Sequence, residues 1–206
     1  DTCGTGGDGS GTFNISTTVA FIAAGAGAAV AKHGNRAVSS RSGSADVLEA
    51  LGVRTDVSAD LAAECVDTAG VGFLFAPSHH PAVAKVGPIR RQLGARTVFN
   101  LLGPLSNPAG AKRQLLGVYS TSLVLPVAEA LKALGSEEAM VVSSKDGLDE
   151  ISLSAPTVIA HLRNGRIKTT ELKPESLGLM RRPLSALAGG DAKNNAWITR
   201  AVLFGE

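Results

Sequence analysis

The sequence predicts an α/β fold with a mainly parallel central sheet flanked by helices, on three observations. Short apolar runs typical of buried strands alternate with helical patterns across short connections, as in parallel sheets. Hydrophobic residues make up 44% of the 206 positions and charged residues 18%, a balance that supports a sizeable core and excludes disorder. Five prolines between residues 77 and 108 interrupt the alternation, which predicts a helical excursion away from the sheet.

The first half of the chain is expected to alternate helix and strand. The expected elements are a helix over 16–27, a strand over 28–31, helices over 44–51 and 61–69, and a strand over 72–76. Small side chains in the first helix suit close packing on a sheet. Asp46 lies in the first turn of the second helix, where a carboxylate interacts favourably with the helix dipole. Ser58 precedes the third helix as its expected start.

The second half resumes this alternation after the excursion. The expected elements are short helices over 82–86, 89–93 and 98–102, a strand over 115–119, a helix over 123–134, a strand over 139–142, strands over 157–163 and 166–172, and a final helix that begins near Asp191. The dipeptide Asn164-Gly165 separates the last two strands and is typical of the type I′ turn of a β-hairpin.

Composition and charge exclude several classes of protein. The formal net charge is only +2 and the basic residues are scattered, which argues against nucleic-acid binding. No apolar run approaches the roughly 18 residues of a membrane span. Cys3 and Cys65 are too few for a disulfide framework, so a reduced, cytoplasmic setting is favoured. The chain has no initiating methionine, and we expect it to be the middle of a longer protein.

The sharpest local feature is the run Gly-Thr-Gly-Gly-Asp-Gly-Ser-Gly-Thr at 4–12, with a helix start directly after it. Glycines let backbone N–H groups approach an anion, and a helix N-terminus adds partial positive charge. The hydroxyls of Thr12, Ser16 and Thr17 add donors. A tight turn with an ordinary N-cap would explain Ser16 alone. The number of glycines and hydroxyls together predicts a phosphate cradle.

The residues after this run narrow the type of phosphate ligand. Gly4, Gly6 and Gly9 satisfy the GxGxxG spacing of dinucleotide-binding folds, which require an acidic residue roughly 20 residues further on. The next expected strand instead ends in Lys32-His33. A Walker loop is excluded because no Lys-Ser or Lys-Thr comes after the last glycine. Lys32 could serve a second cluster of phosphate oxygens.

A second candidate site is the adjacent pair Asp149-Glu150, in a loop beyond an expected strand. Carboxylates in such a loop are suitable ligands for Mg²⁺, which combines a few of them with substrate oxygens. Without its context, the pair is better explained by a solvated turn; with a phosphate cradle opposite it in the same sheet, a metal site explains the pair equally well. We interpret other reactive side chains as structural: His79-His80 as the start of a helix, His161 as solvated, and Trp197 as packing the last helix.

Six segments occur in one unbroken order over nearly the whole chain. They are GTGGD at 4–8, NIST at 14–17, KHGNR at 32–36, GSADVLE at 43–49, FNLLGPL at 99–105, and Asp149-Glu150. Together they resemble the anthranilate phosphoribosyltransferase family. The resemblance implies Mg²⁺-dependent transfer of phosphoribose from phosphoribosyl pyrophosphate (PRPP) to anthranilate in tryptophan biosynthesis, by a cytoplasmic homodimer without membrane or nucleic-acid partners.

The resemblance also implies site residues. PRPP contacts are implied for Gly4, Gly7, Asp8, Thr12, Asn14, Ile15, Ser16, Thr17, Lys32, His33, Gly34, Asn35, Arg36, Ala37, Val38, Ser39, Ser40 and Ser44. Anthranilate contacts are implied for Gly4, His33, Asn35, Arg90 and Gly103. Two Mg²⁺ ions would be held by Ser16, Asp149 and Glu150. Arg90 suits the anthranilate carboxylate because a guanidinium is a planar donor fork. No general base is identified.

The implied domain organisation has three parts. Residues 1–76 and 109–206 would form the α/β domain, and 77–108 would pack on a small helical domain of the nucleoside phosphorylase and phosphoribosyltransferase type. Helices before Asp1 and after Glu206 are implied in the whole protein. Two alternatives remain: a related pyrimidine nucleoside phosphorylase, and a non-catalytic relative that binds nucleotides or nucleic acid. Neither gives Arg90 a benzoate to bind, and the non-catalytic one needs no acidic pair.

Overall fold

The computed structural model describes residues 1–37, 40–81, 89, 92 and 97–206. Its strands are β1 (Thr2–Gly4), β2 (Val30–Gly34), β3 (Val71–Phe75), β4 (Arg113–Gly117), β5 (Glu138–Ser144), β6 (Thr157–Arg163) and β7 (Arg166–Leu172). Its helices are α1 (Ile15–Gly25), α2 (Ser44–Ala50), α3 (Ala59–Ala69), α4 (Ala76–His79), α6 (Phe99–Leu102), α7 (Val124–Ala133) and α8 (Ala192–Phe204). Short 3₁₀ turns are η1 (Thr121–Leu123), η2 (Pro174–Leu177) and η3 (Leu184–Leu187). The expected helix over 82–86 lies outside the described residues, as does most of the one over 89–93.

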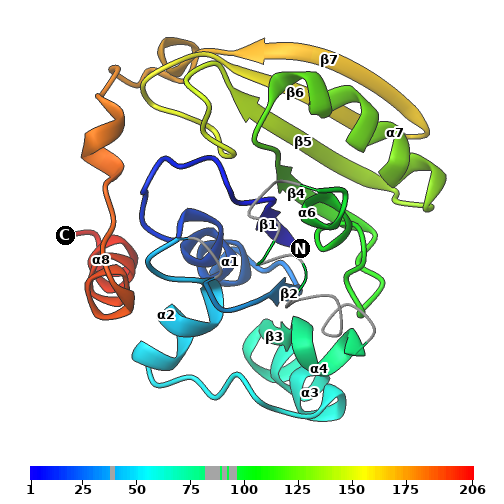
Figure 1. Cartoon of the computed structure of the whole chain (residues 1–206), viewed down its shortest axis with the longest axis vertical. Helices are drawn as coiled ribbons and strands as arrows, with labels where there is room; N and C mark the ends of the chain where they lie inside the picture. Colours follow the sequence, from blue (N-terminus) through cyan, green and yellow to red (C-terminus); the bar gives the residue numbers. More distant parts are fainter. Residues whose placement is uncertain (38–39, 82–88, 90–91, 93–96) are drawn as a thin grey trace.

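The sheet topology confirms the predicted α/β class (Figure 1). Five strands lie in the order β1-β4-β5-β6-β7, in which β1, β4 and β5 are parallel and the last two pairings are antiparallel. The parallel pair β2 and β3 forms a second sheet. Asn107 joins the two sheets because its side-chain amide donates to the Ala31 carbonyl and to the Asp1 carboxylate, both at 2.8 Å.

The β6–β7 hairpin has the bounds that the sequence predicts. Asn164 and Gly165 both have positive φ, 51° and 71°, as a type I′ turn requires. The pairing of Arg163 with Arg166 closes the two-residue loop. The turn residues therefore agree with the register of this hairpin.

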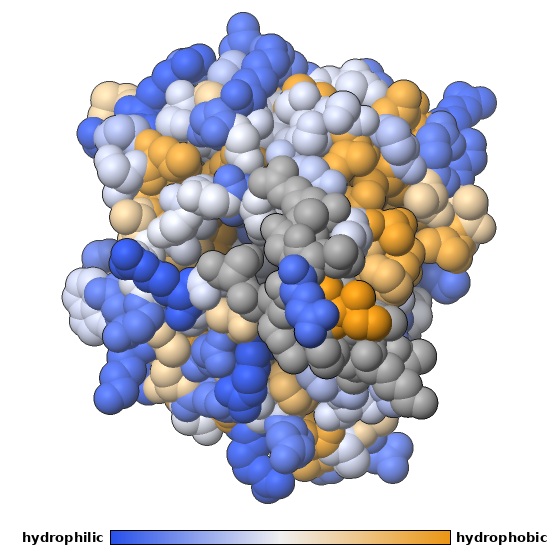
Figure 2. All heavy atoms as spheres, in the orientation of Figure 1, coloured by the Kyte–Doolittle hydropathy of each residue, from blue (hydrophilic) through white to orange (hydrophobic). Residues whose placement is uncertain are grey.

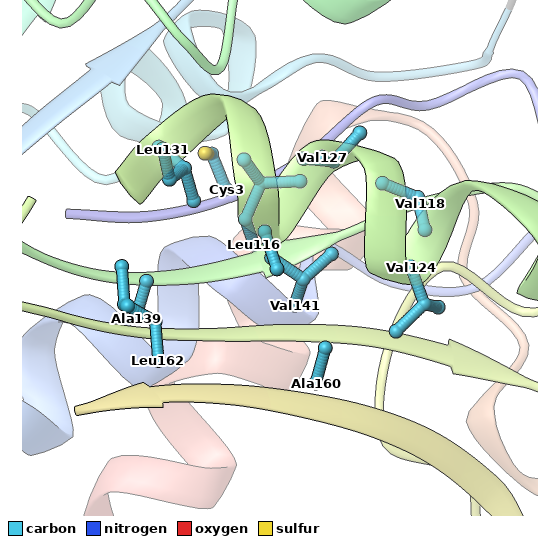
Figure 3. Close-up of a cluster of buried hydrophobic side chains, with 11 residues drawn as sticks. Cys3, Leu116, Val118, Val124, Val127, Leu131, Ala139, Val141, Ala160 and Leu162 are labelled. Carbon is cyan, nitrogen blue, oxygen red and sulfur yellow. The ribbon is translucent and has the colours of Figure 1, made fainter. Parts of the chain in front are cut away.

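The main hydrophobic core lies between α7 and strands β4, β5 and β6 (Figure 3). Leu116, Val141 and Leu162 come from three neighbouring strands and are completely buried. Val124, Val127 and Leu131 recur at helical spacing on α7 and meet them, as expected for an amphipathic helix on a sheet. This packing holds β4 and β5 rigidly, so the loops at their carboxyl ends start from fixed positions.

Strand β2 corrects the predicted strand over 28–31. It runs from Val30 to Gly34, so it includes the buried polar residues Lys32 and His33. Parallel pairing with β3, in which Gly34 lies opposite Phe75, sets its end. Hydrophobicity alone placed the end too early, because backbone pairing continues beyond the apolar residues.

Helix α8 packs on both α1 and α2, away from the β6–β7 hairpin (Figure 1). Trp197 on α8 is 66% exposed, so the expectation that it packs the last helix was wrong. Orange apolar residues and blue polar residues share the face shown in Figure 2. Among the described residues, no helix is long and apolar enough to cross a membrane.

Candidate active site

The glycine-rich loop connects β1 to α1 along residues 5–14. Gly6, Gly7, Gly9 and Gly11 all have φ between 64° and 74°, a left-handed region that costs other residues roughly 1 kcal/mol or more. Asp8 lies among them, and its carboxylate accepts from the Ser10 N–H at 3.3 Å. The glycines are therefore required by the backbone path of the loop.

Helix α1 begins at Ile15 with Asn14 as its N-cap residue, and the Asn14 side chain makes no capping hydrogen bond. This excludes the alternative in which Ser16 is an ordinary N-cap. Ser16 lies in the first turn, and its hydroxyl donates to the Glu150 carboxylate. The start of α1 thus lies against the acidic pair.

The acidic pair is presented by a turn directly after β5. The Ser144 N–H donates to the Leu148 carbonyl at 2.9 Å, which folds the chain back. Asp146 stabilises this turn because its carboxylate accepts from the Leu148 N–H at 3.3 Å and from the Ser152 hydroxyl at 2.7 Å. Burial raises the pKa of Asp146, but hydrogen bonds from Ser154 and Ser152 outweigh burial and lower it. The turn is thereby fixed on a rigid strand end.

Asp149 and Glu150 contact the glycine-rich loop and α1 across more than 130 residues of sequence. The Gly6 N–H donates to Asp149 Oδ2 at 2.7 Å, and Ser16 reaches Glu150. Three residues predicted together from sequence, Ser16 with Asp149 and Glu150, are therefore adjacent. This is the geometry expected where loops meet at the carboxyl ends of parallel strands.

Two glycines make this approach possible. Gly4 and Gly117 lie opposite each other at the ends of β1 and β4. A Cβ on Gly4 would lie 2.5 Å from Asp149 Oδ2, and one on Gly117 would overlap the Asp149 carbonyl oxygen. The sequence analysis missed Gly117; a glycine that ends an apolar strand was the available signal.

The two carboxyl groups titrate far above their usual range. The pKa of Asp149 is raised to about 6, first by burial and then by the Asp8 carboxylate, while the Gly6 N–H opposes both. The pKa of Glu150 is raised to about 7, first by burial; Asp149 also raises it, while the Ser16 hydroxyl and Lys32 lower it. Negative charge is thus concentrated here with less compensation than it needs.

A divalent cation fits this donor set. Asp8 Oδ2 is buried and has no hydrogen-bond partner in the described part of the chain, so the site has an acceptor without a donor. Within the described residues, no three His, Cys, Asp or Glu side chains converge as a complete metal site. A few carboxylates and a hydroxyl correspond to Mg²⁺ sites that are completed by substrate oxygens and water.

Lys32 lies on β2, with its side chain against β1, and is only 4% exposed. Its ammonium donates to the Thr2 carbonyl at 2.5 Å. Burial lowers the pKa of Lys32, whereas Cys3 and Glu150 raise it. Its phosphate contact stays a prediction; what it does here is offset part of the Glu150 charge.

Asp46 organises the second loop, between β2 and α2, which carries implied PRPP contacts such as Asn35, Ser40 and Ser44. Its carboxylate accepts from the N–H groups of Ala37 and Gly43 at 2.9 and 2.8 Å. Burial raises the pKa of Asp46, but these two N–H groups and Arg36 lower it below its usual value. Asp46 therefore holds the loop, a role beyond the expected dipole interaction.

Arg36 is engaged with acidic residues of α2 rather than free for phosphate. Its guanidinium donates to both Glu49 oxygens at 2.7 and 2.5 Å and to Asp46 at 3.2 Å. Ser44 donates to the Asn35 carbonyl at 3.2 Å. Val38 and Ser39 lie outside the described residues, so their predicted contacts are untested.

His33 marks the predicted anthranilate side of the site. Its ring meets the His80 ring edge-on with centroids 5.0 Å apart, and Nε2 of each ring is buried without a partner among the described residues. The pKa of His33 is lowered to about 4, first by burial and then by His80, while a hydrogen bond with the Gly103 backbone opposes both. His33 is therefore neutral near pH 7. Arg90 lies outside the described residues.

His79 and His80 lie between two helical segments. They end the short helix α4, which begins at Ala76 directly after β3, and Pro81 directly after them is helical again, as the predicted helix start requires. This places His80 against His33. His161 is also not simply solvated: it is half-buried, and its ring forms a hydrogen bond with Glu138 at 3.0 Å.

Comparison with known proteins identifies the family. A sequence model of the glycosyl transferase family, a/b domain, matches residues 1–206. The chain belongs to this family. Among curated members, it is 60% identical to the anthranilate phosphoribosyltransferase of Rhodopseudomonas palustris (strain HaA2) over 205 residues, which cover 100% of the chain and 61% of that relative. The chain therefore spans about 60% of the length of the curated relatives it matches.

Solved structures of the family share the fold. The anthranilate phosphoribosyltransferase of Thermus thermophilus superimposes with a TM-score of 0.92 at 50% identity, covering 99% of the chain and 60% of that protein. The Saccharomyces cerevisiae enzyme in complex with PRPP and Mg gives 0.88 at 38% identity, covering 96% and 55%. The yeast complex with 4-fluoroanthranilate gives 0.86 at 36% identity, covering 98% and 55%.

Proposed function

We propose that the chain carries the phosphoribosyl-transfer site of an anthranilate phosphoribosyltransferase. It would transfer the phosphoribosyl group of PRPP to the amino group of anthranilate, giving N-(5′-phosphoribosyl)anthranilate and pyrophosphate in tryptophan biosynthesis. The observation that carries the proposal is the contact of the glycine-rich loop and α1 with Asp149 and Glu150. It joins an anion-binding loop to cation-binding carboxylates in one site.

The glycine-rich loop and the start of α1 suit the phosphates of PRPP. The left-handed glycines keep side chains out of the loop, so a phosphate could approach its backbone, and no side chain caps the first turn of α1. The loop held by Asp46 provides the second set of polar groups. The two loops would position PRPP and stabilise charge on the departing pyrophosphate.

Ser16, Asp149 and Glu150 are the residues that would hold Mg²⁺, with two ions in the proposed complex. The metal supplies charge neutralisation for the pyrophosphate. The chain's part is to keep both carboxylates ionised against their raised pKa values. Lys32 helps because its buried ammonium lowers the pKa of Glu150.

The anthranilate end would be formed by His33, Asn35, Gly103 and Arg90. A neutral His33 can orient an aromatic acid by hydrogen bonding without adding a fixed charge. The carboxylate would meet Arg90. The amine needs no strong base, because it becomes acidic as its bond to the anomeric carbon forms; we assign no general base.

Turnover tests this function directly. The protein is incubated with PRPP, Mg²⁺ and anthranilate, and the fall of anthranilate fluorescence is measured over time. Mg²⁺-dependent loss is expected, and its absence with full-length protein would contradict the proposal. Cleavage of a pyrimidine nucleoside by phosphate under the same conditions would instead identify the nucleoside phosphorylase.

Arg90→Ala tests the assignment of the anthranilate end. The expected loss is roughly ten- to a hundredfold in anthranilate affinity, with little change for PRPP, because one charge-assisted bidentate contact is removed. Arg91→Ala is the matched control. Equal losses for both substrates would contradict the role. Homodimer formation and a cytoplasmic location also belong to the proposal, and sedimentation of the full-length protein tests the first.

A further inference from the structure

Residues 187–195, which include the first turn of α8, hold the glycine-rich loop by backbone hydrogen bonds. The Phe13 N–H donates to the Leu187 carbonyl at 3.0 Å, and the Gly189 N–H donates to the Gly11 carbonyl at 2.9 Å. A Cβ on Gly189 would lie 2.6 Å from Phe13 backbone atoms. The far end of the described chain is therefore closely packed on the loop proposed to bind phosphate.

Asn195 continues this contact as part of a chain of amides. Its side chain is 2% exposed. Asn195 Oδ1 accepts from the Gly190 N–H at 2.7 Å, and Nδ2 donates to Asn14 Oδ1 at 2.8 Å. Asn14 Nδ2 in turn donates to the Ser42 carbonyl at 3.2 Å. We call these groups the amide relay.

The orientation of the amide relay is fixed at both ends by backbone groups. The Gly190 N–H can only donate, so the Asn195 atom that faces it must be oxygen. Asn195 Nδ2 then faces Asn14, which must present its own oxygen. Asn14 Nδ2 is thereby directed at the Ser42 carbonyl, which can only accept. Flipping either amide would place two donors or two acceptors against each other.

The amide relay also prevents Asn14 from capping its own helix. An asparagine at the N-cap normally accepts from the N–H of the second or third helical residue, here Ser16 or Thr17. Asn14 makes no such bond, because its Oδ1 is held by Asn195. The Ser16 N–H instead interacts with the Glu150 carboxylate and lowers its pKa, so the start of this 11-residue helix is tied to the acidic pair and not to Asn14.

We propose that Asn195 is a positioning residue for PRPP, acting through Asn14. It keeps the start of α1 uncapped and ties the glycine-rich loop to the Ser40–Ser44 side of the second loop. This inference rests on the proposed function for its ligand. It assigns to α8, which contributes none of the predicted site residues, an indirect part in the phosphate site.

A double-mutant cycle tests the proposal. PRPP affinity is measured by calorimetry in Mg²⁺ for Asn195→Ala, Asn14→Ala and the double variant. Asn195→Ala is expected to weaken PRPP binding about tenfold, because a buried amide loses its partner and Asn14 becomes free to cap α1. The double variant is expected to bind no more weakly than Asn14→Ala. Wild-type affinity in Asn195→Ala, or losses that multiply, would overturn the proposal.

Thr199→Val is the matched control on the same helix. Thr199 is fully buried, and its hydroxyl forms a hydrogen bond with Thr18 at 2.9 Å without reaching either loop. It is expected to lower thermal stability while PRPP affinity stays unchanged. Asn195→Asp is the second variant, since it keeps the size and the acceptor for Gly190 but loses the donor to Asn14. It is expected to bind PRPP as weakly as Asn195→Ala.

Hydrogen exchange separates this inference from the proposed function. In Asn195→Ala, backbone N–H groups of residues 40–44 are expected to exchange faster than in wild type, and in Thr199→Val they are not. If wild-type full-length protein binds no PRPP, the proposed function is wrong, and exchange alone decides the amide relay. If wild-type protein binds PRPP and exchange over 40–44 is unaltered by Asn195→Ala, the amide relay is overturned.

Discussion

The two ends of strand β5 both carry clustered charges, but they differ in every property that matters for chemistry. At the amino end, Arg113, Glu137, Glu138 and Arg163 line an open hollow of about 490 Å³. At the carboxyl end, Asp149 is 8% exposed, and the buried ammonium of Lys32 lies close enough to lower the pKa of Glu150. The amino end has the open hollow, and the carboxyl end has the greater electrostatic imbalance.

This difference shows that neither the volume of a hollow nor the number of charged residues around it is enough to locate the functional site. At the amino end the charges are paired and exposed: Arg113 meets Glu137 at 3.2 Å with side chains 74% and 59% exposed. Such pairs contribute about 0–1 kcal/mol to the free energy of unfolding. Each charge already has a partner, so a ligand has no unpaired charge to bind. At the carboxyl end, burial raises the pKa of both carboxyl groups and leaves an acceptor unpaired among the described residues. A ligand can stabilise only the second arrangement.

The largest expected effect is steric and lies at the carboxyl end. Gly117→Ala is expected to destabilise the fold by more than about 3 kcal/mol, because its Cβ would overlap a backbone oxygen that cannot rotate away. Chemical denaturation measures this. Gly25→Ala is the control: its Cβ meets nothing within 4 Å, and alanine suits the end of α1. A small cost for Gly117→Ala would mean that the turn carrying Asp149 is loosely packed.

The next effect separates function from stability. Asp149→Asn with Glu150→Gln is expected to weaken Mg²⁺-dependent PRPP binding about 100-fold or more. Without metal at pH 8, its free energy of unfolding is expected to rise, because groups with raised pKa values are ionised there at a cost. The matched control, Glu137→Gln with Glu138→Gln, should change PRPP binding and the free energy of unfolding much less. Unaltered PRPP binding in the first variant would place the metal elsewhere.

A third test uses pH. The pKa of His33 falls from 6.5 to about 4 on folding, so the unfolded state binds the extra proton between these values. Wild type should therefore lose stability relative to His33→Gln as pH falls from 6.5 to 4, by up to about 3 kcal/mol. Asp149 and Glu150 act in the opposite direction in both proteins and cancel in the difference. A difference independent of pH would contradict the buried, neutral His33.

The smallest effect is expected at the amino end. Arg113→Gln should change the free energy of unfolding by less than about 0.5 kcal/mol, because it removes one exposed ion pair. PRPP affinity should stay at the wild-type value. Thermal melts at low and high salt measure the contribution. A loss above about 1 kcal/mol would show that the hollow is more ordered than exposed pairs normally are.

Much of the site could be read from sequence because its parts are local. The glycine-rich loop, the Asn164-Gly165 turn and the acidic pair each express a preference of a few adjacent residues. Glycine tolerates left-handed backbone, and Asn-Gly favours a type I′ turn, wherever they occur. The order of strands and helices was predictable for the same reason, although the ends of β2 were misplaced and the strand predicted over 115–119 is β4, Arg113–Gly117.

The sequence by itself therefore determined the fold class, the phosphate-type loop and the identity of the metal-binding candidates. Only the tertiary structure decided that Gly117 must lack a side chain, that His80 lies against His33, and that Asn195 holds Asn14. Asn195 and Asn14 lie 181 residues apart, so no local pattern records their contact. Burial then decides the chemistry, because a polar group withdrawn from water is stabilised only by the partners that the fold brings to it.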